Sequence, residues 1–378
     1  MAKLSEICNI QSGGTPSRSC VEYWENGKIP WVKISDIKDK ELNQTEEFIT
    51  ELGVEKSSAK LFPKGTILYS IFATLGEVCI LNIDATTNQA IAGLQLTNES
   101  VLPDYLYYYL VSKKDFVNYI GRGVAQNNIN LKILRNMEIP IPNKEEQERI
   151  VLRLNKLNQC ISLRKQQLKK LDELVKSRFI EMFGDPVNNS KGLPELTLPE
   201  LGEFGRGVSK HRPRNDPKLL GGKYPLIQTG EVANSNLYIT EYESTYSELG
   251  FKQSKLWQKG TLCITIAANI AKTAILTFDA CFPDSVVGFK ANDKTNNIFI
   301  HYWFSFFQAI LEAQAPESAQ KNINLKTLSE LKIIIPTIDL QNQFAEFVEQ
   351  TDKLKYEVKQ GLEKLEILKK ALMQEYFG

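Results

Sequence analysis

The chain has 378 residues, of which 42% are hydrophobic and 24% are charged, which is an ordinary globular composition with enough apolar side chains for two or three buried cores. The formal net charge of +1 excludes nucleic-acid binding driven by a bulk basic charge and leaves only local basic patches. The six cysteines (Cys8, Cys20, Cys79, Cys160, Cys263 and Cys281) form no C-x-x-C pair, so they predict reduced thiols and neither a disulfide framework nor a zinc site.

The chain shows no targeting or membrane pattern. Its first residues lack the apolar run of a signal peptide, and its most apolar stretch, residues 299–311, is too short to cross a membrane and predicts a buried aromatic helix. The only histidines, His211 and His301, are too few for a histidine-rich metal site. We therefore expect a soluble, cytoplasmic protein with no metal site and no membrane partner.

In chain order, the first predicted element is a strand-rich mixed domain over residues 1–143. Their apolar runs are short, as in GTILYSIF (65–72) and IAGLQL (91–96), and Gly, Pro, Asn and Asp separate them. Residues 190–336 repeat this pattern with GTLCITIA (260–267) and SVVGFK (285–290), which predicts a second domain of the same class.

The segments after each domain, 144–184 and 337–378, predict long helices. Residues 144–183 contain no Gly or Pro, and apolar side chains recur at alternating intervals of four and three, which is a heptad seam. The first seam consists of Ile150, Leu154, Leu157, Ile161, Leu168, Leu171, Val175 and Met182, with interruptions at Arg164 and Arg178. The second consists of Phe344, Val348, Thr351, Val358, Leu362, Leu365, Leu372 and Tyr376, with Lys355 as its flaw. Asn143 and Thr337 are the expected N-caps, and Gly184 is the expected end of the first helix.

The two halves are copies of one unit. QNNINLK (126–132) returns as QKNINLK (320–326), and the register between 126–184 and 320–378 never slips. We predict an α+β protein of two tandem strand-rich mixed α/β domains, joined and spaced by two long helices that form an antiparallel coiled coil with pseudo-two-fold symmetry. In the alternative, each helix packs on its own globular domain.

Several long motifs resemble the specificity subunits of type I restriction–modification systems. IPIPNKEEQERIVLRLNKL (139–157) and SRFIEMFGDP (177–186) are similar to the family's conserved regions. GGTPS (13–17) with IPWVKISDI (29–37) resembles one kind of target-recognition domain, and SKHRPRNDP (209–217) with GGKYPLIQTGEV (221–232) resembles another. The likeness covers essentially the whole chain and follows the family's order of domain and helix.

The resemblance implies a non-catalytic reader of double-stranded DNA. Residues 1–143 and 190–336 would be target-recognition domains, each reading one half of a split, asymmetric sequence, and the helices 144–184 and 337–378 would set the gap. The helices would also dock two modification subunits that carry S-adenosylmethionine and methylate adenine. Two restriction subunits could join and supply ATP-driven, Mg-dependent restriction, so this chain itself is expected to hold no cofactor.

Base-reading residues are expected where the two copies diverge, because identical residues cannot distinguish two different half-sites. In the first copy, Gly13 and Gly14 allow close backbone approach and nearby side chains offer donors, namely Thr15, Ser17 and Arg18, with a simple turn as the alternative. Lys33 follows a short strand and is a further candidate. In the second copy, a locally basic stretch without obvious nearby acids favours DNA contact over a solvated loop: Lys210, His211, Arg212, Arg214 and Lys218. Gln228 and Thr229 suit adenine or thymine edges.

The repeated heptapeptide is predicted to be shared framework. Its polar members are Gln126, Asn128, Asn130 and Lys132, and then Gln320, Asn322, Asn324 and Lys326. We favour a structural turn leading into the last strand of each domain, with a shared DNA-backbone contact as the alternative.

Two other functional classes compete with a DNA reader. An adenine methyltransferase would need an Asn/Asp-Pro-Pro-aromatic loop, which is missing, and Pro283-Asp284 lacks the Glu-x-Lys partner of a metal-dependent nuclease. A coiled-coil scaffold that joins two domains for other ligands is the second rival. It should show no salt-dependent binding to duplex DNA, whereas a DNA reader should lose affinity as salt rises.

Overall fold

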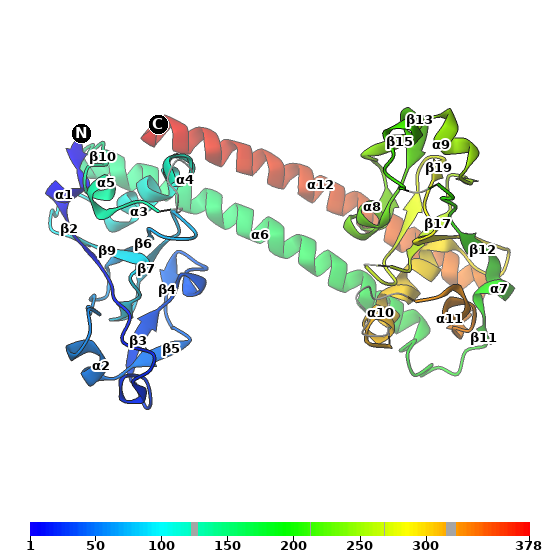
Figure 1. The fold of residues 1–378 in the computed structure, drawn as a ribbon, viewed down its shortest axis with the longest axis horizontal. Coiled ribbons are helices and arrows are strands. Elements are labelled where there is room, and N and C mark those ends of the chain that lie inside the picture. Colours follow the sequence, from blue (N-terminus) through cyan, green and yellow to red (C-terminus); the bar gives the residue numbers. More distant parts are fainter. Residues whose placement is uncertain (122–127, 212, 268, 315–322) are drawn as a thin grey trace. The chain divides into compact units, whose positions relative to one another are not determined.

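The structure is a computed structural model that describes residues 1–121, 128–211, 213–267, 269–314 and 323–378. The chain divides into two compact units (Figure 1). Unit 1 contains Met1–Lys165 and Gln360–Gly378, and unit 2 contains Gln166–Lys359. Each unit therefore combines one strand-rich domain with parts of both long helices.

Unit 1 is built on a five-stranded sheet in the order β2-β9-β6-β7-β4, in which only β4 runs parallel to its neighbour. These strands are β2 (Cys8–Ser12), β4 (Glu41–Leu42), β6 (Ile67–Ser70), β7 (Val78–Leu81) and β9 (Ile91–Leu96). A smaller sheet has β5 (Glu47–Ile49), β3 (Ile29–Val32) and β8 (Thr86–Thr87), with β3 parallel to β8. A third ladder pairs β1 (Ala2–Lys3) with β10 (Glu138–Ile139).

Short helices complete unit 1. They are α1 (Leu4–Ile7), η1 (Val21–Tyr23), η2 (Ile34–Asp36), α2 (Glu51–Glu55), α3 (Pro103–Ser112), α4 (Lys114–Gly121) and α5 (Leu131–Arg135). Helix α3 buries Tyr105, Tyr108 and Tyr109 against the sheet. Their hydroxyls remain satisfied, since Tyr105 donates to the carbonyl of Pro140 (2.9 Å) and Tyr109 to that of Glu138 (2.9 Å).

Unit 2 repeats the five-stranded sheet strand for strand, and its second sheet has one strand more than that of unit 1. Its five-stranded sheet has the order β12-β20-β17-β18-β14, and its second sheet the order β15-β13-β19-β16. The strands are β12 (Gly202–Arg206), β13 (Leu220–Leu226), β14 (Tyr238–Ile239), β15 (Ser244–Tyr246), β16 (Leu256–Trp257), β17 (Leu262–Thr265), β18 (Thr273–Leu276), β19 (Ala280–Cys281) and β20 (Val286–Ala291), and β11 (Glu195–Leu196) pairs with β21 (Ile333–Ile334). The helices are α7 (Leu198–Leu201), η3 (Pro217–Leu219), α8 (Thr229–Asn234), α9 (Glu248–Lys252), α10 (Asn297–Gln314) and α11 (Leu325–Ser329). The predicted α+β class with two like domains is confirmed.

The two long helices are α6 (Lys144–Phe183) and α12 (Ile338–Phe377). Asn143 caps α6, since its Oδ1 accepts from the amide of Glu146 (2.9 Å). The chain leaves α6 at Gly184, whose φ of +78° lies in the left-handed region that favours glycine.

The long helices pair antiparallel within each unit. In unit 1, the first turns of α6, with Ile150 and Leu154, share a core with Met373 and Phe377 from the last turns of α12. In unit 2, Phe179 and Phe183 near the end of α6 pack on Phe344 near the start of α12, with ring centroids 5.4 and 5.5 Å apart. The ends of both helices are also buried in the globular cores, so the helix pairing and the packing on the domains occur together.

The buried stripe departs from the predicted seam near the helix ends. Ile150, Leu154, Leu157 and Ile161 are buried as the heptad predicts, whereas Leu168, Leu171, Leu362 and Leu365 are half-buried. Further on, Phe179 and Phe183 are buried instead of Met182, and Met373 and Phe377 instead of Leu372 and Tyr376. An α-helix drifts against a strict 3.5-residue repeat, so the stripe rotates by one residue toward the aromatic core.

The flaw at Lys355 is also buried, with its side chain 11% exposed. Its Nζ lies 2.7 Å from Asp172 Oδ1 on α6 and 3.5 Å from Asp352 Oδ1 on its own helix. The cation is therefore compensated inside the helix pair of unit 2.

The six cysteines are all free thiols. Within the described residues, no group of three or more His, Cys, Asp or Glu is placed to hold a metal ion. No helix in the same part of the chain is long and apolar enough to cross a membrane.

Candidate nucleic-acid interface

The same edge of each domain collects polar loops, because two parallel strands end there. In unit 1, β3 and β8 end together, and the amide of Asn88 donates to the carbonyl of Val32 (3.2 Å). In unit 2, β13 and β19 end together, and the amide of Ile227 donates to the carbonyl of Cys281 (2.9 Å). The loop after the first long strand, β2 or β12, joins each edge. We call these the loop edges: residues 13–18, 33 and 88–89 in unit 1, and residues 207–211, 213–218, 228–229 and 283–284 in unit 2.

Gly13 and Gly14 serve the fold of the loop edge. Both are buried, and a Cβ at Gly13 would lie 2.0 Å from Thr87 Oγ1, while one at Gly14 would lie 2.2 Å from Ser58 Oγ. The close approach that these glycines permit is thus to the protein's own chain. Contact between this backbone and DNA stays a prediction.

Arg18 is held in a cage of two tryptophan rings and one carboxylate. Its guanidinium lies 3.6 Å from the ring centroid of Trp24 and 4.8 Å from that of Trp31, and it pairs with Glu47 at 2.6 Å. Because the hydrogen bond from Arg18 stabilises its charged form, the pKa of Glu47 lies below its usual value. The Arg18 side chain is nevertheless 53% exposed, so it is pre-positioned and still accessible.

Lys33 belongs to the same network. It follows β3, and its Nζ lies 2.9 Å from Glu47 and 3.0 Å from Glu46. The hydrogen bonds to Glu47 and then Glu46 raise the pKa of Lys33. The structure thus brings Arg18 and Lys33 together through the carboxylate of Glu47, a link that joins three separate stretches of sequence.

Thr15 and Ser17 lie on either side of buried Pro16. The Thr15 hydroxyl bonds to the side-chain oxygen of Gln89, the residue that follows Asn88 at the end of β8. Ser17 Oγ lies 2.8 Å from Ser19 Oγ, and the Ser17 carbonyl accepts from the indole of Trp24 (3.0 Å). Sequence reasoning missed Gln89 as a member of this site.

The basic loop of unit 2 has acidic partners. The premise that this stretch lacks nearby acids is therefore wrong. His211 Nε2 lies 3.3 Å from Asp216 Oδ2, and Arg214 pairs with Asp284, 70 residues further along the chain. Gln253 accepts from the amides of Lys210 (2.5 Å) and His211 (2.9 Å) and holds the loop in place. Arg212 lies outside the described residues.

Lys210 and Lys218 are both exposed, and neither forms an ion pair with any other described residue. They are therefore the cations of this loop that are best suited to neutralise phosphates. Gln228 occupies the position that Lys33 has in unit 1, immediately before a short helix, and is exposed at the loop edge. Thr229 begins that helix and is half-buried.

The repeated heptapeptide caps a one-turn helix in each unit. Asn130 Oδ1 accepts from the amide of Ile133 (2.9 Å) at the start of α5, and Asn324 Oδ1 accepts from the amide of Thr327 (2.8 Å) at the start of α11. Lys132 and Lys326 are exposed. Gln126, Gln320 and Asn322 lie outside the described residues, and Asn128 forms a bridge with Phe72. The shared asparagines thus shape the approach to β10 and β21.

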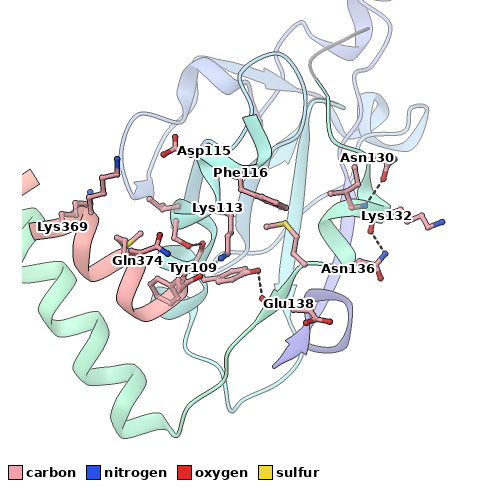
Figure 2. Close-up of a pocket in the computed structure, with 18 of the residues that line it drawn as sticks. Tyr109, Lys113, Asp115, Phe116, Asn130, Lys132, Asn136, Glu138, Lys369 and Gln374 are labelled. Carbon is pink, nitrogen blue, oxygen red and sulfur yellow. Dashed lines mark hydrogen bonds between the residues drawn. The ribbon is translucent and has the colours of Figure 1, made fainter. Parts of the chain in front are cut away.

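A groove of about 1000 Å³ lies in unit 1 between α4, α5, β10 and the last turns of α12 (Figure 2). Met137, Met373 and Phe377 form part of its apolar lining, and lysines including Lys113 and Lys369 lie around it. Lys113 donates to the carbonyl of Phe377, and burial lowers the pKa of this lysine. None of the residues that line the groove belongs to the loop edge, so the two features are separate.

Two copies of one mixed domain that present different polar side chains at the same edge define a two-domain binding protein. A family model described as the type I restriction modification DNA specificity domain matches residues 1–173 and 195–367. The chain belongs to this family.

Named relatives agree with this assignment. The chain is 33% identical over 272 residues to the type I restriction enzyme MjaIX specificity subunit of Methanocaldococcus jannaschii, an alignment that covers 67% of this chain and 62% of that relative. The chain therefore spans less than two thirds of the MjaIX subunit. It is 25% identical over 379 residues to the EcoprrI specificity subunit of Escherichia coli, which covers 93% of this chain and 87% of that one.

Solved structures share the fold. One, described as the structural basis underlying complex assembly and conformational transition of the type I R-M system, matches all of this chain and 96% of its own with a TM-score of 0.64 and 18% identity. The S subunit from M. genitalium matches all of this chain and 95% of its own with a TM-score of 0.58 and 16% identity. At these identities the likeness concerns the fold alone.

Proposed function

We propose that this chain is the non-catalytic DNA-reading subunit of a type I restriction–modification complex. Each strand-rich domain reads one half of a bipartite, asymmetric target, and the long helices set the gap between the halves. The observation that carries this proposal is the repeated loop edge: the backbone construction is the same in both units, while the exposed side chains differ.

The chemistry of the loop edges suits DNA. Caged Arg18 and the tethered Arg214 offer guanidinium forks, which match the O6 and N7 of guanine. Lys210 and Lys218 contact phosphates, and Gln228 and Thr229 contact base edges or the adjacent backbone. In unit 1, Thr15, Ser17 and Lys33 take the corresponding roles. Gly13 and Gly14 support the loop and let its backbone approach DNA closely.

The long helices dock two modification subunits, which carry S-adenosylmethionine and methylate adenine, and restriction subunits join with ATP and Mg. Exposed apolar side chains on α6 support partner docking, because a helix that met only water would carry polar residues there. Leu152 and Leu163 are 54% and 55% exposed and are eleven residues apart, about three helical turns, so they lie on one face of the helix.

The test is a methylome. This chain is co-expressed with its modification subunit in a host without adenine methylation, and the genome is sequenced with modification detection. The expected result is a split, non-palindromic motif with one methylated adenine on each strand, and exchange of residues 1–143 should change only one half. An assembled, cofactor-loaded complex that leaves the genome unmethylated contradicts the proposal.

Binding of duplex DNA by the purified complex distinguishes a DNA reader from the remaining rival, a coiled-coil scaffold for other ligands. A DNA reader should bind its motif with an affinity that falls steeply as salt rises, because bound counterions are released from the phosphates. A scaffold for other ligands should show no such binding.

A further inference from the structure

The loop edges share one turn whose second residue differs between the units. In unit 1 the turn runs from Asn88 to Ile91, and the amide of Ile91 donates to the carbonyl of Asn88 (3.3 Å). In unit 2 it runs from Pro283 to Val286, and the amide of Val286 donates to the carbonyl of Pro283 (3.0 Å). The second residue of this turn is Gln89 in unit 1 and Asp284 in unit 2. Each turn leads directly into a central strand, β9 or β20, so a well-packed sheet fixes its position.

The glycines of the preceding loop confirm this equivalence. A Cβ on Gly13 would lie 2.4 Å from the carbonyl oxygen of Thr87 and 2.7 Å from that of Asn88. A Cβ on Gly207 would lie 2.2 Å from the carbonyl oxygen of Phe282 and 2.4 Å from that of Pro283. The loop after the first long strand therefore crosses the same two peptide groups in both units, and Gln89 and Asp284 are the residues that follow them.

In both units the side chain of this residue binds the crossing loop. Gln89 accepts from the hydroxyl of Thr15, and Asp284 accepts from the guanidinium of Arg214. Gln89 is exposed, and the Asp284 side chain is 34% exposed. The position thus combines a fixed backbone, a side chain held by a neighbour and access from solvent, while its chemistry changes from an amide to a carboxylate.

These two chemistries address different bases. An amide can bond the N6 and N7 of adenine with two hydrogen bonds, whereas a carboxylate lacks the donor that N7 requires. A carboxylate can instead hold an arginine in the orientation that suits the O6 and N7 of guanine. We propose that this turn position decides one base in each half-site: Gln89 contacts an adenine in the half read by unit 1, and Asp284 positions Arg214 on a guanine in the half read by unit 2. The inference rests on the proposed DNA-reading function and assigns it two residues.

The test for unit 1 compares the methylomes of complexes that carry the unchanged chain, Gln89→Ala and Gln89→Asp. The unchanged chain should methylate a split motif. Both variants should lose, by on the order of ten-fold or more, the preference for adenine at a single position of one half, and leave the other half unchanged. The matched control is Gln95→Ala, since Gln95 lies toward the opposite end of β9 and should leave the motif intact. A Gln89→Ala complex whose base preferences match those of the unchanged chain at every position overturns the assignment.

The test for unit 2 uses Asp284→Asn, Asp284→Glu and Arg214→Lys. Asp284→Asn and Arg214→Lys should relax the same single guanine position in the other half, and Asp284→Glu should retain it because its carboxylate still pairs with Arg214. If Asp284→Asn instead lowers methylation equally at all sites without changing the motif, the residue has only a structural role. An unchanged chain that yields no motif at all would count against the proposed function itself, which is a different result from an unchanged variant motif.

Discussion

Gln147 and Gln341 occupy the same position of the repeat, and each has its amide fully buried between the start of a long helix and the domain before it. Gln147 donates to the carbonyls of Ser100 (2.8 Å) and Pro142 (2.9 Å) and accepts from the amide of Leu102 (2.9 Å). Gln341 donates to the carbonyls of Lys294 (3.0 Å) and Pro336 (2.9 Å) and accepts from the hydroxyl of Thr295 (2.8 Å). One side chain thus fixes the first turn of each long helix to its domain.

Replacing Gln341 by leucine should destabilise unit 2. The change removes the hydrogen bonds from Gln341 to two carbonyls and from the Thr295 hydroxyl to Gln341, in a buried site. Each buried polar group that loses its hydrogen-bond partner costs roughly 1–3 kcal/mol. We expect a loss of at least about 2 kcal/mol in the free energy of unfolding, measured by urea denaturation. Gln343→Leu, on the exposed side of the same turn, should stay within about 0.5 kcal/mol of the unchanged protein. Equal effects of the two changes would contradict this account of Gln341.

His301 should make the stability of unit 2 depend on pH. It lies in α10, its Nδ1 is 2.9 Å from the Thr273 hydroxyl, and burial lowers its pKa from 6.5 to about 4. Below pH 6.5, His301 takes up a proton in the unfolded chain but stays neutral in the folded chain. The contribution of neutral, buried His301 to the free energy of unfolding is therefore present above pH 6.5 and is lost as pH falls toward 4. The expected slope is about 1.4 kcal/mol per pH unit for this single group.

The measurement for His301 is urea denaturation at several pH values between 4 and 7. His301→Gln should flatten the curve across this window, while the exposed control His211→Gln should keep its slope. A curve for His301→Gln as steep as that of the unchanged protein would show that other groups cause the pH dependence.

Lys355→Met should also destabilise unit 2, although methionine fits an apolar seam. The carboxylate of Asp352, whose side chain is only 25% exposed, loses the ammonium group 3.5 Å away. Burial already raises the pKa of Asp352 despite Lys355, so its charge is costly in the folded state. We expect a loss of roughly 1–3 kcal/mol near neutral pH, less than for a fully buried pair.

Two further results would show that the unpaired carboxylate of Asp352 causes the loss of stability in Lys355→Met. The loss in Lys355→Met should shrink as pH falls and Asp352 takes up a proton, and adding Asp352→Asn should recover most of the stability. Thermal unfolding at neutral and acidic pH measures both. No recovery in the double variant would mean that the lost contact with Asp172 dominates instead.

If the modification subunits dock on α6, replacing two exposed leucines of that helix should prevent assembly of the complex. Leu152→Glu with Leu163→Glu should abolish or strongly weaken co-purification with the modification subunit while leaving the melting temperature of the isolated chain nearly unchanged, since neither side chain is buried. The matched control is Leu61→Glu, which is 52% exposed in the first domain and directly precedes the bridge between Phe62 and Ala85. Normal assembly of the double variant would place the partner on another surface.

The sequence allowed the prediction of features that depend on local pattern and repetition. The heptad spacing and the cap at Asn143 predicted α6, and the recurrence of Asn130 at Asn324 indicated a common framework. Features that depend on distant contacts were missed. The acid that pairs with Arg214 is Asp284, and the carboxylate that links Arg18 to Lys33 is Glu47, neither of which is adjacent in sequence.

Two other misses follow the same logic. The packing of Gly13 and Gly14 was not foreseen, because the sequence does not show that Thr87 and Ser58 occupy the space beside them. The register between Asp84-Ala85 and Asp279-Ala280 already places Gln89 opposite Asp284, so the repeat contained a signal for that pair. Only the pairing of β3 with β8 and of β13 with β19 brings these residues to the loop edge.

The burial of Phe377 has a consequence for how the chain matures on the ribosome. Its ring packs on Tyr105 with centroids 5.2 Å apart, so the core of the first domain includes a side chain that is made only after the whole second domain. At 5–20 residues per second, the roughly 200 residues between Lys165 and Gln360 take about 10–40 s to translate. During that time the first domain lacks the side chains of Met373 and Phe377, which complete its core in the folded protein.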